Sequence, residues 1–341
     1  MWSIHFSSQA LIRIYIDIPN TNVEDKLIKG GNLVKSIYSF LPKSIEDLIL
    51  TIPPQKRKGI EEIRVRVGRP LEVFINGHSL FFPFLISKED GFQLLNKISQ
   101  YSVYTMEEEL KRGYITVEGG HRIGLAGRVV LENSKVKAIR DVASFNIRIA
   151  NEQLGIAKPF IPYLYDRGKW LHTMIIGPPQ TGKTTLLRDI ARLISTEDEH
   201  RRYKAAKVGI VDERSEIAGC MEGIPQMTFG PRVDVLDACP KAEGMMMMIR
   251  SMSPEVLIVD EIGRKEDEEA ILEAVNAGIQ LIMTTHGSTF EEVKKRPILE
   301  TIIKMGIFDR YIELNRKEGP GTISAIRDGQ GQLLMNEMKV K

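Results

Sequence analysis

The stretch from Gly177 to Thr184, which reads Gly-Pro-Pro-Gln-Thr-Gly-Lys-Thr, constrains the fold of this 341-residue chain more than any other feature. It follows a short apolar segment, His172–Ile176, that is typical of a buried strand, and it opens a helical pattern over Thr184–Ser195. Gly177 and Gly182 allow the loop to turn several backbone N–H groups toward one point. The N-terminus of the following helix adds further donors and a partial positive charge. A strand, loop and helix of this kind bind a chain of phosphates.

This phosphate-binding loop predicts that the ligand is ATP together with Mg²⁺. Lys183 occupies the position that reaches the β- and γ-phosphates, and the Thr184 hydroxyl occupies the position that binds Mg²⁺. The alternative, a glycine-rich turn without a ligand, leaves the complete motif and its setting between a strand and a helix unexplained. The residues expected to contact the nucleotide are Gly177, Pro178, Pro179, Gln180, Thr181, Gly182, Lys183, Thr184 and Thr185.

A second strand end carries two acids that suit such a ligand. Val256–Val259 is a continuous apolar run, and Asp260 and Glu261 follow it directly. Ligands of open α/β sheets bind at the carboxyl ends of the strands. We expect Asp260 to support Mg²⁺ together with Thr184, and Glu261 to orient or deprotonate the attacking water. Taken alone, the same pattern also fits a strand that meets a solvated turn.

Two further strand ends carry polar side chains. One follows Lys207–Val211 and begins with Asp212 and Glu213, and the other follows Leu281–Thr284 and contains His286. Both ends supply candidate catalytic residues, for which a solvated loop charge and a structural histidine are the alternatives. Parallel neighbouring strands bring their carboxyl ends to one edge of a sheet. The side chains expected to share a site there are Lys183, Glu213, Glu261 and His286.

Strands and helices alternate after residue 151, which indicates a parallel sheet covered by helices on both faces. The fold class expected is therefore α/β, a RecA-like P-loop ATPase core preceded by a smaller α+β domain. The expected strands cover 172–176, 207–211, 256–259 and 281–284, and the expected helices cover 184–195, 242–252 and 267–277. We divide the chain into an N-terminal domain (1–150), a linker (151–170) and the ATPase domain (171–341).

The first 150 residues indicate a small α+β domain with hairpins. Ile60–Val67 alternates apolar and charged residues, as a half-buried strand does. Asn76 and Gly77 form the strongest short signal for a hairpin. Ser87 is expected to cap a helix over Lys88–Tyr101. The other expected elements are strands over 71–75, 78–82, 114–117, 122–131 and 144–149, a helical stretch over 34–50 interrupted at Pro42, and a loop over 53–59.

The composition excludes several classes of protein. Two cysteines, Cys220 and Cys239, cannot form a disulfide framework or a four-cysteine zinc site. No stretch approaches the roughly 18 uninterrupted apolar residues that indicate a membrane-spanning helix. Residues 1–30, in which Leu11–Ile18 fits a strand and a frayed terminus equally well, have no Lys or Arg before Arg13, unlike a signal peptide. We therefore expect a cytoplasmic protein.

Residues 60–315 resemble the secretion-type ATPases of type II and type IV secretion and of pilus retraction. The matching passages are the run before the second acid motif (245–255), the stretch that starts at its glutamate (261–270), an acidic box (212–216) and a histidine box (285–288). The resemblance implies ATP hydrolysis by a homo-oligomer, a hexamer in that family, which sits at the cytoplasmic face of a membrane and drives membrane-embedded secretion or channel subunits. The chain departs from the family at Asp260, where those ATPases have glycine, and in its Asp-Glu-Arg-Ser-Glu acidic box.

Two N-terminal passages resemble a branch of this family that acts during sporulation. They are Ile63–Pro70 and the hairpin Glu118–Arg128. The resemblance implies a location in the mother cell and a role in energising a channel between the mother cell and the forespore.

The same family implies an arginine that stabilises the charge on the γ-phosphate and comes from the N-terminal domain of the same or a neighbouring subunit. The N-terminal domain offers four candidates near the expected junction: Arg122, Arg128, Arg140 and Arg148. Arg140 is the first choice, because it is in the β-rich stretch nearest to the expected linker, and Arg128 is the second. For each of them the alternative is an exposed arginine on a strand face.

Two other functions remain open at this point. Residues 1–150 carry a net charge of +5 and residues 151–341 one of −3, so a nucleic-acid-dependent RecA-like ATPase is one alternative. Against it, Arg64, Arg66 and Arg69 lie close to Glu61 and Glu62, and no aromatic stacking motif accompanies them. We therefore do not expect a nucleic-acid partner. The other alternative is a scaffold that binds ATP but scarcely hydrolyses it.

Overall fold

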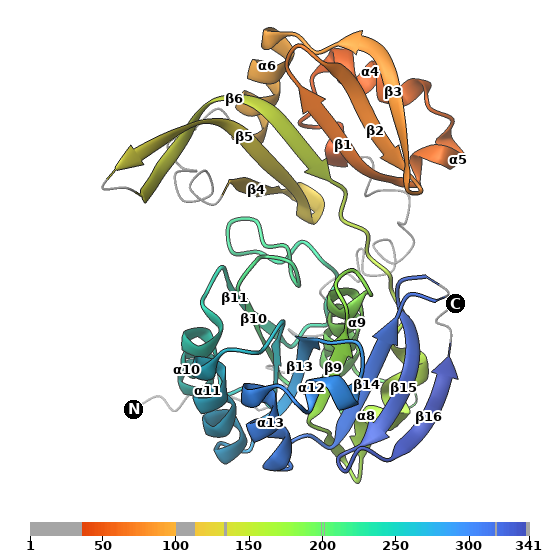
Figure 1. Cartoon of the computed structure of the whole chain (residues 1–341), viewed down its shortest axis with the longest axis vertical. Coiled ribbons are helices and arrows are strands. Elements are labelled where there is room, and N and C mark those ends of the chain that lie inside the picture. The colour runs from red at the N-terminus through yellow and green to blue at the C-terminus, as the bar shows by residue number, and fades with distance from the viewer. Residues whose placement is uncertain are drawn as a thin grey trace, which may run out of the picture.

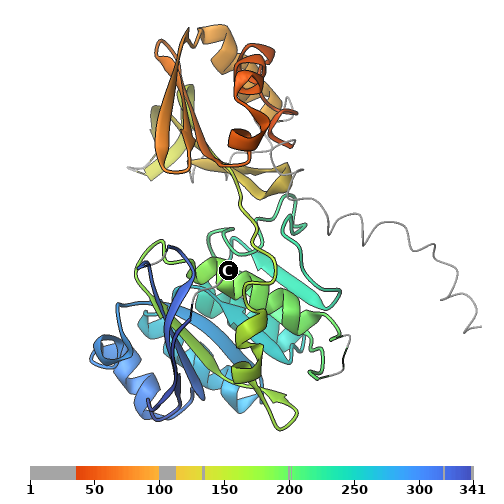
Figure 2. The same cartoon turned by 90° about the vertical axis from the view of Figure 1, so that its right-hand side faces the viewer.

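The computed structural model describes residues 36–99, 113–132, 135–198, 200, 202–317 and 319–338. The expectations for residues 1–30, including Leu11–Ile18, lie outside these residues. Within them, no helix has both the length and the apolar character that a membrane span requires. The described residues form a six-stranded sheet in the N-terminal region, residues 36–150, and an eight-stranded sheet and a two-stranded sheet in the C-terminal region, residues 151–338. Figures 1 and 2 show the two larger sheets with their helices.

The N-terminal region is an antiparallel sheet whose strands follow the order β3-β2-β1-β6-β5-β4. Buried side chains of α4 and α6, among them Ile45 and Leu94, pack on the apolar face of β1 and β2. The strands are β1 (Ile60–Arg66), β2 (Pro70–Ile75), β3 (His78–Leu85), β4 (Tyr114–Val117), β5 (His121–Glu132) and β6 (Lys135–Arg148). The helices are α4 (Lys43–Thr51), α5 (Pro54–Arg57) and α6 (Lys88–Ile98), with a short 3₁₀ turn, η2 (Glu118–Gly120).

Local sequence signals explain most of these elements. Asn76 and Gly77 both have positive φ, 49° and 78°, as the predicted hairpin turn requires. Ser87 caps α6, because its side chain accepts the Asp90 N–H while the Asp90 carboxylate accepts the Ser87 N–H. Two expectations were wrong in extent. Pro54 starts a single helical turn where a loop was expected, and β6 is much longer than the predicted 144–149 because it pairs with β5 along a long hairpin.

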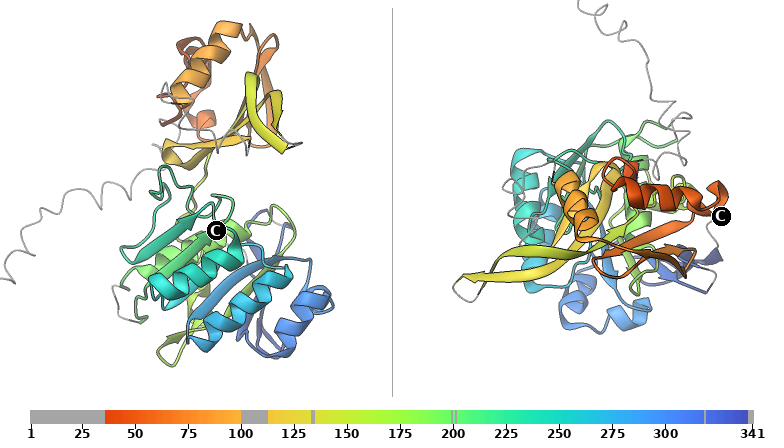
Figure 3. Two further views of the ribbon diagram at one scale, coloured as in Figure 1. Left: turned by 90° about the vertical axis from the view of Figure 1, so that its left-hand side faces the viewer. Right: turned by 90° about the horizontal axis from the view of Figure 1, so that it is seen from above.

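That hairpin, which we call the β5–β6 arm, extends sideways beyond the rest of the molecule (Figure 1; Figure 3, right). It bends at a bulge between Ala126 and Arg128. Gly127 is required there, since a Cβ atom at this position would lie 2.5 Å from the carbonyl oxygen of Arg140. Near the end of the arm, Val129, Leu131 and Val136 are exposed.

The C-terminal region contains a sheet in the order β11-β10-β12-β13-β9-β14-β15-β16. The strands from β11 to β14 in this order are parallel, and β15 and β16 are antiparallel to their neighbours. The strands are β9 (Thr173–Gly177), β10 (Val208–Asp212), β11 (Val233–Asp237), β12 (Val256–Val259), β13 (Gln280–His286), β14 (Arg310–Asn315), β15 (Thr322–Asp328) and β16 (Leu333–Met338). The sequence had predicted β9, β10, β12 and β13, and the structure confirms them.

Helices cover both faces of this sheet (Figure 2). Successive residues of β9 show the two faces, because Ile175 belongs to one hydrophobic cluster while Met174 and Ile176 belong to the other. The helices are α9 (Lys183–Ser195), α10 (Lys241–Ser251), α11 (Lys265–Asn276), α12 (Phe290–Val293) and α13 (Pro297–Lys304). The first three confirm the predicted helices over 184–195, 242–252 and 267–277.

The segment expected to be a linker, residues 151–170, packs in part against the C-terminal region. Its second half forms η3 (Lys158–Phe160), α8 (Ile161–Leu164), β7 (Tyr165–Asp166) and β8 (Lys169–Trp170). Phe160 and Leu164 are fully buried in the hydrophobic cluster under α9. The Asp189 carboxylate on α9 accepts the N–H groups of Gly155 (3.1 Å) and Ala157 (2.8 Å). Free chain between the two regions is therefore short.

Candidate active site

The phosphate-binding loop connects β9, which ends at Gly177, to α9, which begins at Lys183. Gly182 has a φ of 88°, a conformation that glycine adopts at little cost. A Cβ atom at Gly177 would lie 2.5 Å from Oγ1 of Thr181, whose hydroxyl donates to the Pro178 carbonyl at 2.8 Å. The two glycines of the motif are thus explained by the shape of the loop.

Lys183 is 5% exposed, and its ammonium group lies inside this loop. The Nζ atom donates to the carbonyl oxygens of Gly177 (2.8 Å) and Pro178 (3.1 Å), and it lies 3.2 Å from Nδ1 of His286. Burial lowers the pKa of Lys183, and the nearby charges of Asp260 and Glu261 act in the opposite direction. A buried cation whose direct partners are two carbonyl oxygens and an imidazole nitrogen suits an anionic ligand.

Asp260 lies between two hydroxyl groups. Thr184, at the start of α9, donates to Oδ2 of Asp260 at 2.7 Å, and Thr284 of β13 donates to Oδ1. The carboxylate and the Thr184 hydroxyl therefore adjoin at the start of the phosphate-binding helix. Mg²⁺ is held in nucleotide sites by one or two protein oxygens together with phosphate oxygens and water. The donor set at Thr184 and Asp260 fits this ion.

Glu261 is held from three sides. Its carboxylate accepts from Nε2 of His286 on Oε1 (2.9 Å) and from Nη1 of Arg214 on Oε2 (2.9 Å). Its own N–H donates to Oγ1 of Thr284 at 2.8 Å. The backbone adopts a φ of 56°, which is uncommon outside glycine and occurs often at functional sites. Glu261 thus has a fixed position next to Asp260 while its side chain remains 23% exposed.

Glu213 belongs to a neighbouring cluster. Its carboxylate lies 2.8 Å from Nζ of Lys241 and 3.6 Å from Nη1 of Arg264. Burial by itself raises the pKa of Glu213, but the hydrogen bond from Lys241 and the surrounding positive charges outweigh this effect and lower the pKa overall. A small cleft is lined by Glu213 and Lys241 together with Asp260 and Glu261. The structure therefore brings Lys183, Glu261 and His286 into one network of contacts and places Glu213 beside it.

The structure locates the two candidate arginines away from this network. Arg128 and Arg140 are exposed Cα partners on the β5–β6 arm. Arg140 lies in β6, the strand nearest to the expected linker, but β6 continues beyond it to Arg148, so Arg140 itself lies on the arm. The arm extends away from the C-terminal region of its own chain (Figure 1). A role for either arginine at a nucleotide stays a prediction.

Sequence reasoning missed three residues of the site. Thr284 bonds to both Asp260 and Glu261 but had been assigned only to the end of an apolar strand. Arg214 and Lys241 supply the cations that face Glu261 and Glu213. Arg214 was visible inside the acidic box, whereas the contact of Lys241 depends on the parallel packing of β10 and on the start of α10, and no spacing in the sequence indicates it.

Comparison with known proteins identifies a family and a relative that match most of the chain. Residues 32–334 match the family described as "Sporulation stage III, protein AA". The chain is 55% identical over 308 residues to "Stage III sporulation protein AA" of Bacillus subtilis (strain 168), an alignment that covers 90% of this chain and 99% of the relative. A part of the chain, 38% of its length, is 36% identical to "Protein SEEDLING PLASTID DEVELOPMENT 1" of Arabidopsis thaliana and covers 18% of that protein.

Solved structures agree on the fold. The Legionella pneumophila ATPase DotB superposes with a TM-score of 0.54 at 18% identity, covering 79% of this chain and 75% of DotB. The pilus retraction motor PilT, solved with bound ADP, superposes with a TM-score of 0.55 at 17% identity, covering 87% of this chain and 83% of PilT. The predicted fold class is confirmed: the chain has the RecA-like fold of the secretion ATPases, preceded by a smaller N-terminal part. By the match over residues 32–334 and the identity along nearly its full length, the chain belongs to the sporulation stage III protein AA family.

Proposed function

We propose that this protein is an Mg²⁺-dependent ATPase that powers assembly of, or transport through, a membrane channel complex between the mother cell and the forespore during sporulation. The observation that carries the proposal is the contact network in which Lys183, Thr184, Asp260 and Glu261 surround one end of the phosphate-binding loop. Membership of the sporulation family supports the cellular role.

The phosphate-binding loop and α9 bind the triphosphate. Lys183 exchanges the carbonyl oxygens of Gly177 and Pro178 for the β- and γ-phosphates, which satisfy a buried ammonium group better than neutral carbonyls do. The Thr184 hydroxyl and the Asp260 carboxylate hold Mg²⁺, which supplies neutralisation of the phosphate charge when bound. Thr284 fixes the Asp260 carboxylate in this position.

Glu261 orients the attacking water. A carboxylate offers about four lone-pair sites, and Arg214 and His286 use one on each oxygen. The remaining sites accept a hydrogen bond from water and aim its oxygen at the γ-phosphate. His286 also lies 3.2 Å from Nζ of Lys183, so it links the group that binds phosphate to the group that orients water.

Glu213 supports this arrangement from the neighbouring cluster. Its ion pair with Lys241 holds that ammonium group at the small cleft that Glu261 also lines. Lys241 is 6% exposed, so the pair fixes the start of α10 beside the end of β10.

Arg128 and Arg140 complete the site from a neighbouring subunit of a homo-oligomer, which we propose to be a hexamer. Two exposed like charges directly opposite each other on a hairpin repel one another and are destabilising in isolation. An anion between them, such as the γ-phosphate of ATP bound to the next subunit, removes that repulsion. The two guanidinium groups then stabilise the negative charge of the transition state. The direction of the arm favours action between subunits over action within one chain (Figure 1).

The proposed location is the cytoplasmic side of a membrane in the mother cell, with the hexamer bound to membrane-embedded channel subunits. The nucleic-acid alternative receives little support from the N-terminal surface, because Arg64 pairs with Glu62 and Arg66 pairs with Glu72.

The test is ATP turnover by the purified protein, with particle mass measured with and without nucleotide. We expect Mg²⁺-dependent turnover that falls at least ~10²-fold in Lys183→Ala and in Glu261→Gln. Glu261→Gln should still bind ATP, because the loop and Lys183 remain intact. Arg202→Ala is the control variant, since Arg202 is an exposed arginine that pairs with Asp198 and follows the C-terminal end of α9.

Three outcomes would contradict the proposal. Equal turnover in wild type and Lys183→Ala would show that the activity comes from elsewhere. Stimulation by single- or double-stranded nucleic acid with steep salt dependence would favour the nucleic-acid-dependent ATPase. Full function of Glu261→Gln in sporulating cells would favour a scaffold that only binds ATP.

A further inference from the structure

A short loop after β10, residues 213–218, contacts the candidate active site on one side and the N-terminal region on the other. We call it the β10 loop. The Asp212 carboxylate folds it by accepting the N–H groups of Glu216 (2.9 Å), Ile217 (2.9 Å) and Ala218 (2.8 Å). Arg188 of α9 donates to the carbonyl oxygens of Glu216 (2.7 Å) and Ile217 (2.6 Å). The C-terminal half of the β10 loop is therefore fixed to the helix that follows the phosphate-binding loop.

Arg214 in the N-terminal half of this loop faces both regions of the chain. Its guanidinium group is 2.9 Å from Oε2 of Glu261. Its backbone carbonyl faces the N-terminal region, where the Tyr114 hydroxyl is 3.4 Å away and Nη1 of Arg122 is 3.5 Å away. One residue thus joins the carboxylate that orients water to the surface of β4 and β5.

The N-terminal side of this contact consists of two stacked side chains, Tyr114 of β4 and Arg122 of β5. The Arg122 guanidinium lies 3.5 Å from the centre of the Tyr114 ring and makes an ion pair of 2.8 Å with Glu216 of the β10 loop. Stacking on the aromatic ring and pairing with the carboxylate restrict the conformations of the Arg122 side chain. Arg122 and Tyr114 therefore move together with the sheet of the N-terminal region.

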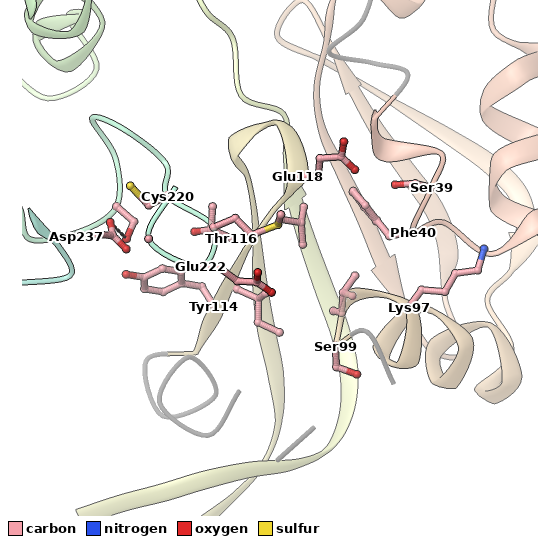
Figure 4. Close-up of a pocket in the computed structure, with 16 residues that line it drawn as sticks. Ser39, Phe40, Lys97, Ser99, Tyr114, Thr116, Glu118, Cys220, Glu222 and Asp237 are labelled. Carbon is pink, nitrogen blue, oxygen red and sulfur yellow. Dashed lines mark hydrogen bonds between the residues drawn. The ribbon is translucent and has the colours of Figure 1, made fainter. Parts of the chain in front are cut away.

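A second contact between the two regions lies at η2, where the Gly119 N–H donates to Oε1 of Gln226 at 3.2 Å. A cavity of about 480 Å³ separates the two regions and is lined by Ser39 and Phe40 on one side and by Cys220 and Glu222 on the other. Figure 4 shows Tyr114 at its border, directed toward Asp237, which accepts a hydrogen bond from Ser215 of the β10 loop at 2.7 Å. A movement of the N-terminal region that displaces Tyr114 and Arg122 relative to the β10 loop therefore changes the width of this cavity and also separates η2 from Gln226.

We propose that Arg214 is a positioning residue for Glu261, and that the N-terminal region controls the rate of hydrolysis through it. When Tyr114 and Arg122 engage the β10 loop, the Arg214 guanidinium holds one oxygen of Glu261 while His286 holds the other, and the carboxylate plane is fixed for the water. When the N-terminal region withdraws, Arg214 is released and the carboxylate rotates about its His286 contact. This inference rests on the proposed ATPase function and adds a residue and a control to it.

Steady-state ATP turnover of the full chain tests the proposal, with ATP affinity measured separately. Arg214→Ala should lower kcat about tenfold, because the loss of one hydrogen bond to a charged group corresponds to a change of about that size. The Kd for ATP should stay within about twofold of the wild-type value. Arg214→Lys keeps the positive charge but lacks the planar guanidinium group and its several N–H donors, so its kcat should lie between those of Arg214→Ala and wild type. Arg202→Ala is the control for loss of an exposed, paired arginine and should match wild type.

The contribution of the N-terminal region is tested with Arg122→Met, which keeps an apolar side chain over Tyr114 but removes the charge. We expect a drop in kcat of about threefold without a change in Kd. The double variant Arg122→Met/Arg214→Ala should be no slower than Arg214→Ala alone, because both changes act on the same carboxylate. Particle mass and melting temperature of each variant establish that it is folded and assembled as wild type is.

The outcomes separate this proposal from the proposed function. A wild-type protein without turnover overturns both. Normal turnover with an unchanged kcat in Arg214→Ala, or with a change in Kd alone, overturns the role of Arg214 and leaves the ATPase function standing. Drops in kcat that multiply in the double variant show that Arg122 acts independently, which overturns the control through Arg214.

Discussion

Thr284 provides the sharpest test of how the site is held together. Its side chain is fully buried in β13, accepts the Glu261 N–H at 2.8 Å and donates to Oδ1 of Asp260. Thr284→Val replaces the hydroxyl with a methyl group of nearly the same shape. The substitution therefore leaves the strand and its packing in place and removes only these two hydrogen bonds.

The expected cost follows from the two bonds. A hydrogen bond to a charged group contributes about 1.5–3 kcal/mol and a neutral one about 0.5–1.5 kcal/mol, so the loss amounts to about 2–4 kcal/mol. This is less than the stability of a typical folded domain, and the variant should fold. The same free energy, if it is needed to place both acids in the transition state, corresponds to a decrease in kcat of about 30- to 1,000-fold.

The assay is steady-state ATP turnover at saturating Mg²⁺, with ATP affinity measured separately. The affinity should change little, because Lys183 and the loop are intact. Thr284→Ser keeps the hydroxyl and should stay within about threefold of wild type. Thr173→Val is the matched control, since Thr173 is equally buried at the other end of β9 and its hydroxyl donates only to the Leu171 carbonyl, at 3.0 Å.

A Thr284→Val protein that turns over ATP at the wild-type rate would refute the reasoning. Asp260 and Glu261 would then be positioned by something other than this hydroxyl. An equal loss of rate in Thr173→Val would point instead to general loosening of the sheet.

Three further predictions concern stability and ions. Asp189→Asn should lower the free energy of unfolding by about 2–4 kcal/mol in urea titrations, because an amide cannot accept both backbone N–H groups and also pair with Arg192; an unchanged midpoint would argue against this anchor. Burial raises the pKa of Asp212 to about 6, so the folded protein binds this proton more tightly than the unfolded chain does. The resulting stabilisation of the folded state is complete below about pH 4 and is lost as the pH rises through 6. Wild type should therefore lose about 1 kcal/mol of unfolding free energy between pH 5 and pH 7.5 that Asp212→Asn does not lose. A difference between the two proteins that stays constant with pH would contradict the raised pKa. Chelation of Mg²⁺ should abolish turnover and re-addition should restore it, whereas turnover that persists in excess EDTA would exclude the proposed role of Thr184 and Asp260.

The parts of the site that were predictable from the sequence are those governed by short-range geometry. The phosphate-binding loop needs glycines and a lysine at fixed positions, and Glu261 follows a strand whose buried character is evident from its residues. Each of these predictions depends on residues that are close together in the sequence, so it can be made without knowing the fold.

The remainder depends on which strands become neighbours. Thr284 reaches Asp260 because β13 lies beside β12, and Lys241 reaches Glu213 because α10 starts next to the end of β10. Pairing at the far edge also escaped prediction: β11 is a partly exposed strand with Asp234 and Asp237 among its residues, and its pattern resembles a loop. Contacts of this kind are decided by packing rather than by local preference.

The hydrogen bonds to Asp189 limit the length of chain that connects the two regions. The last residue of the N-terminal region, Ala150, donates its N–H to Nδ1 of His121, and the next backbone N–H that a side chain accepts is that of Gly155, which donates to Asp189. Between them the Glu152 carboxylate accepts from the N–H (2.6 Å) and the hydroxyl (2.9 Å) of Thr228. Five peptide units join Ala150 to Gly155, and fully stretched they reach about 18 Å. While the hydrogen bonds of Ala150 and Gly155 both stay in place, a movement of the N-terminal region away from α9 can extend this segment to no more than that length. A longer movement requires Gly155 to separate from Asp189 on α9, the helix that follows the phosphate-binding loop.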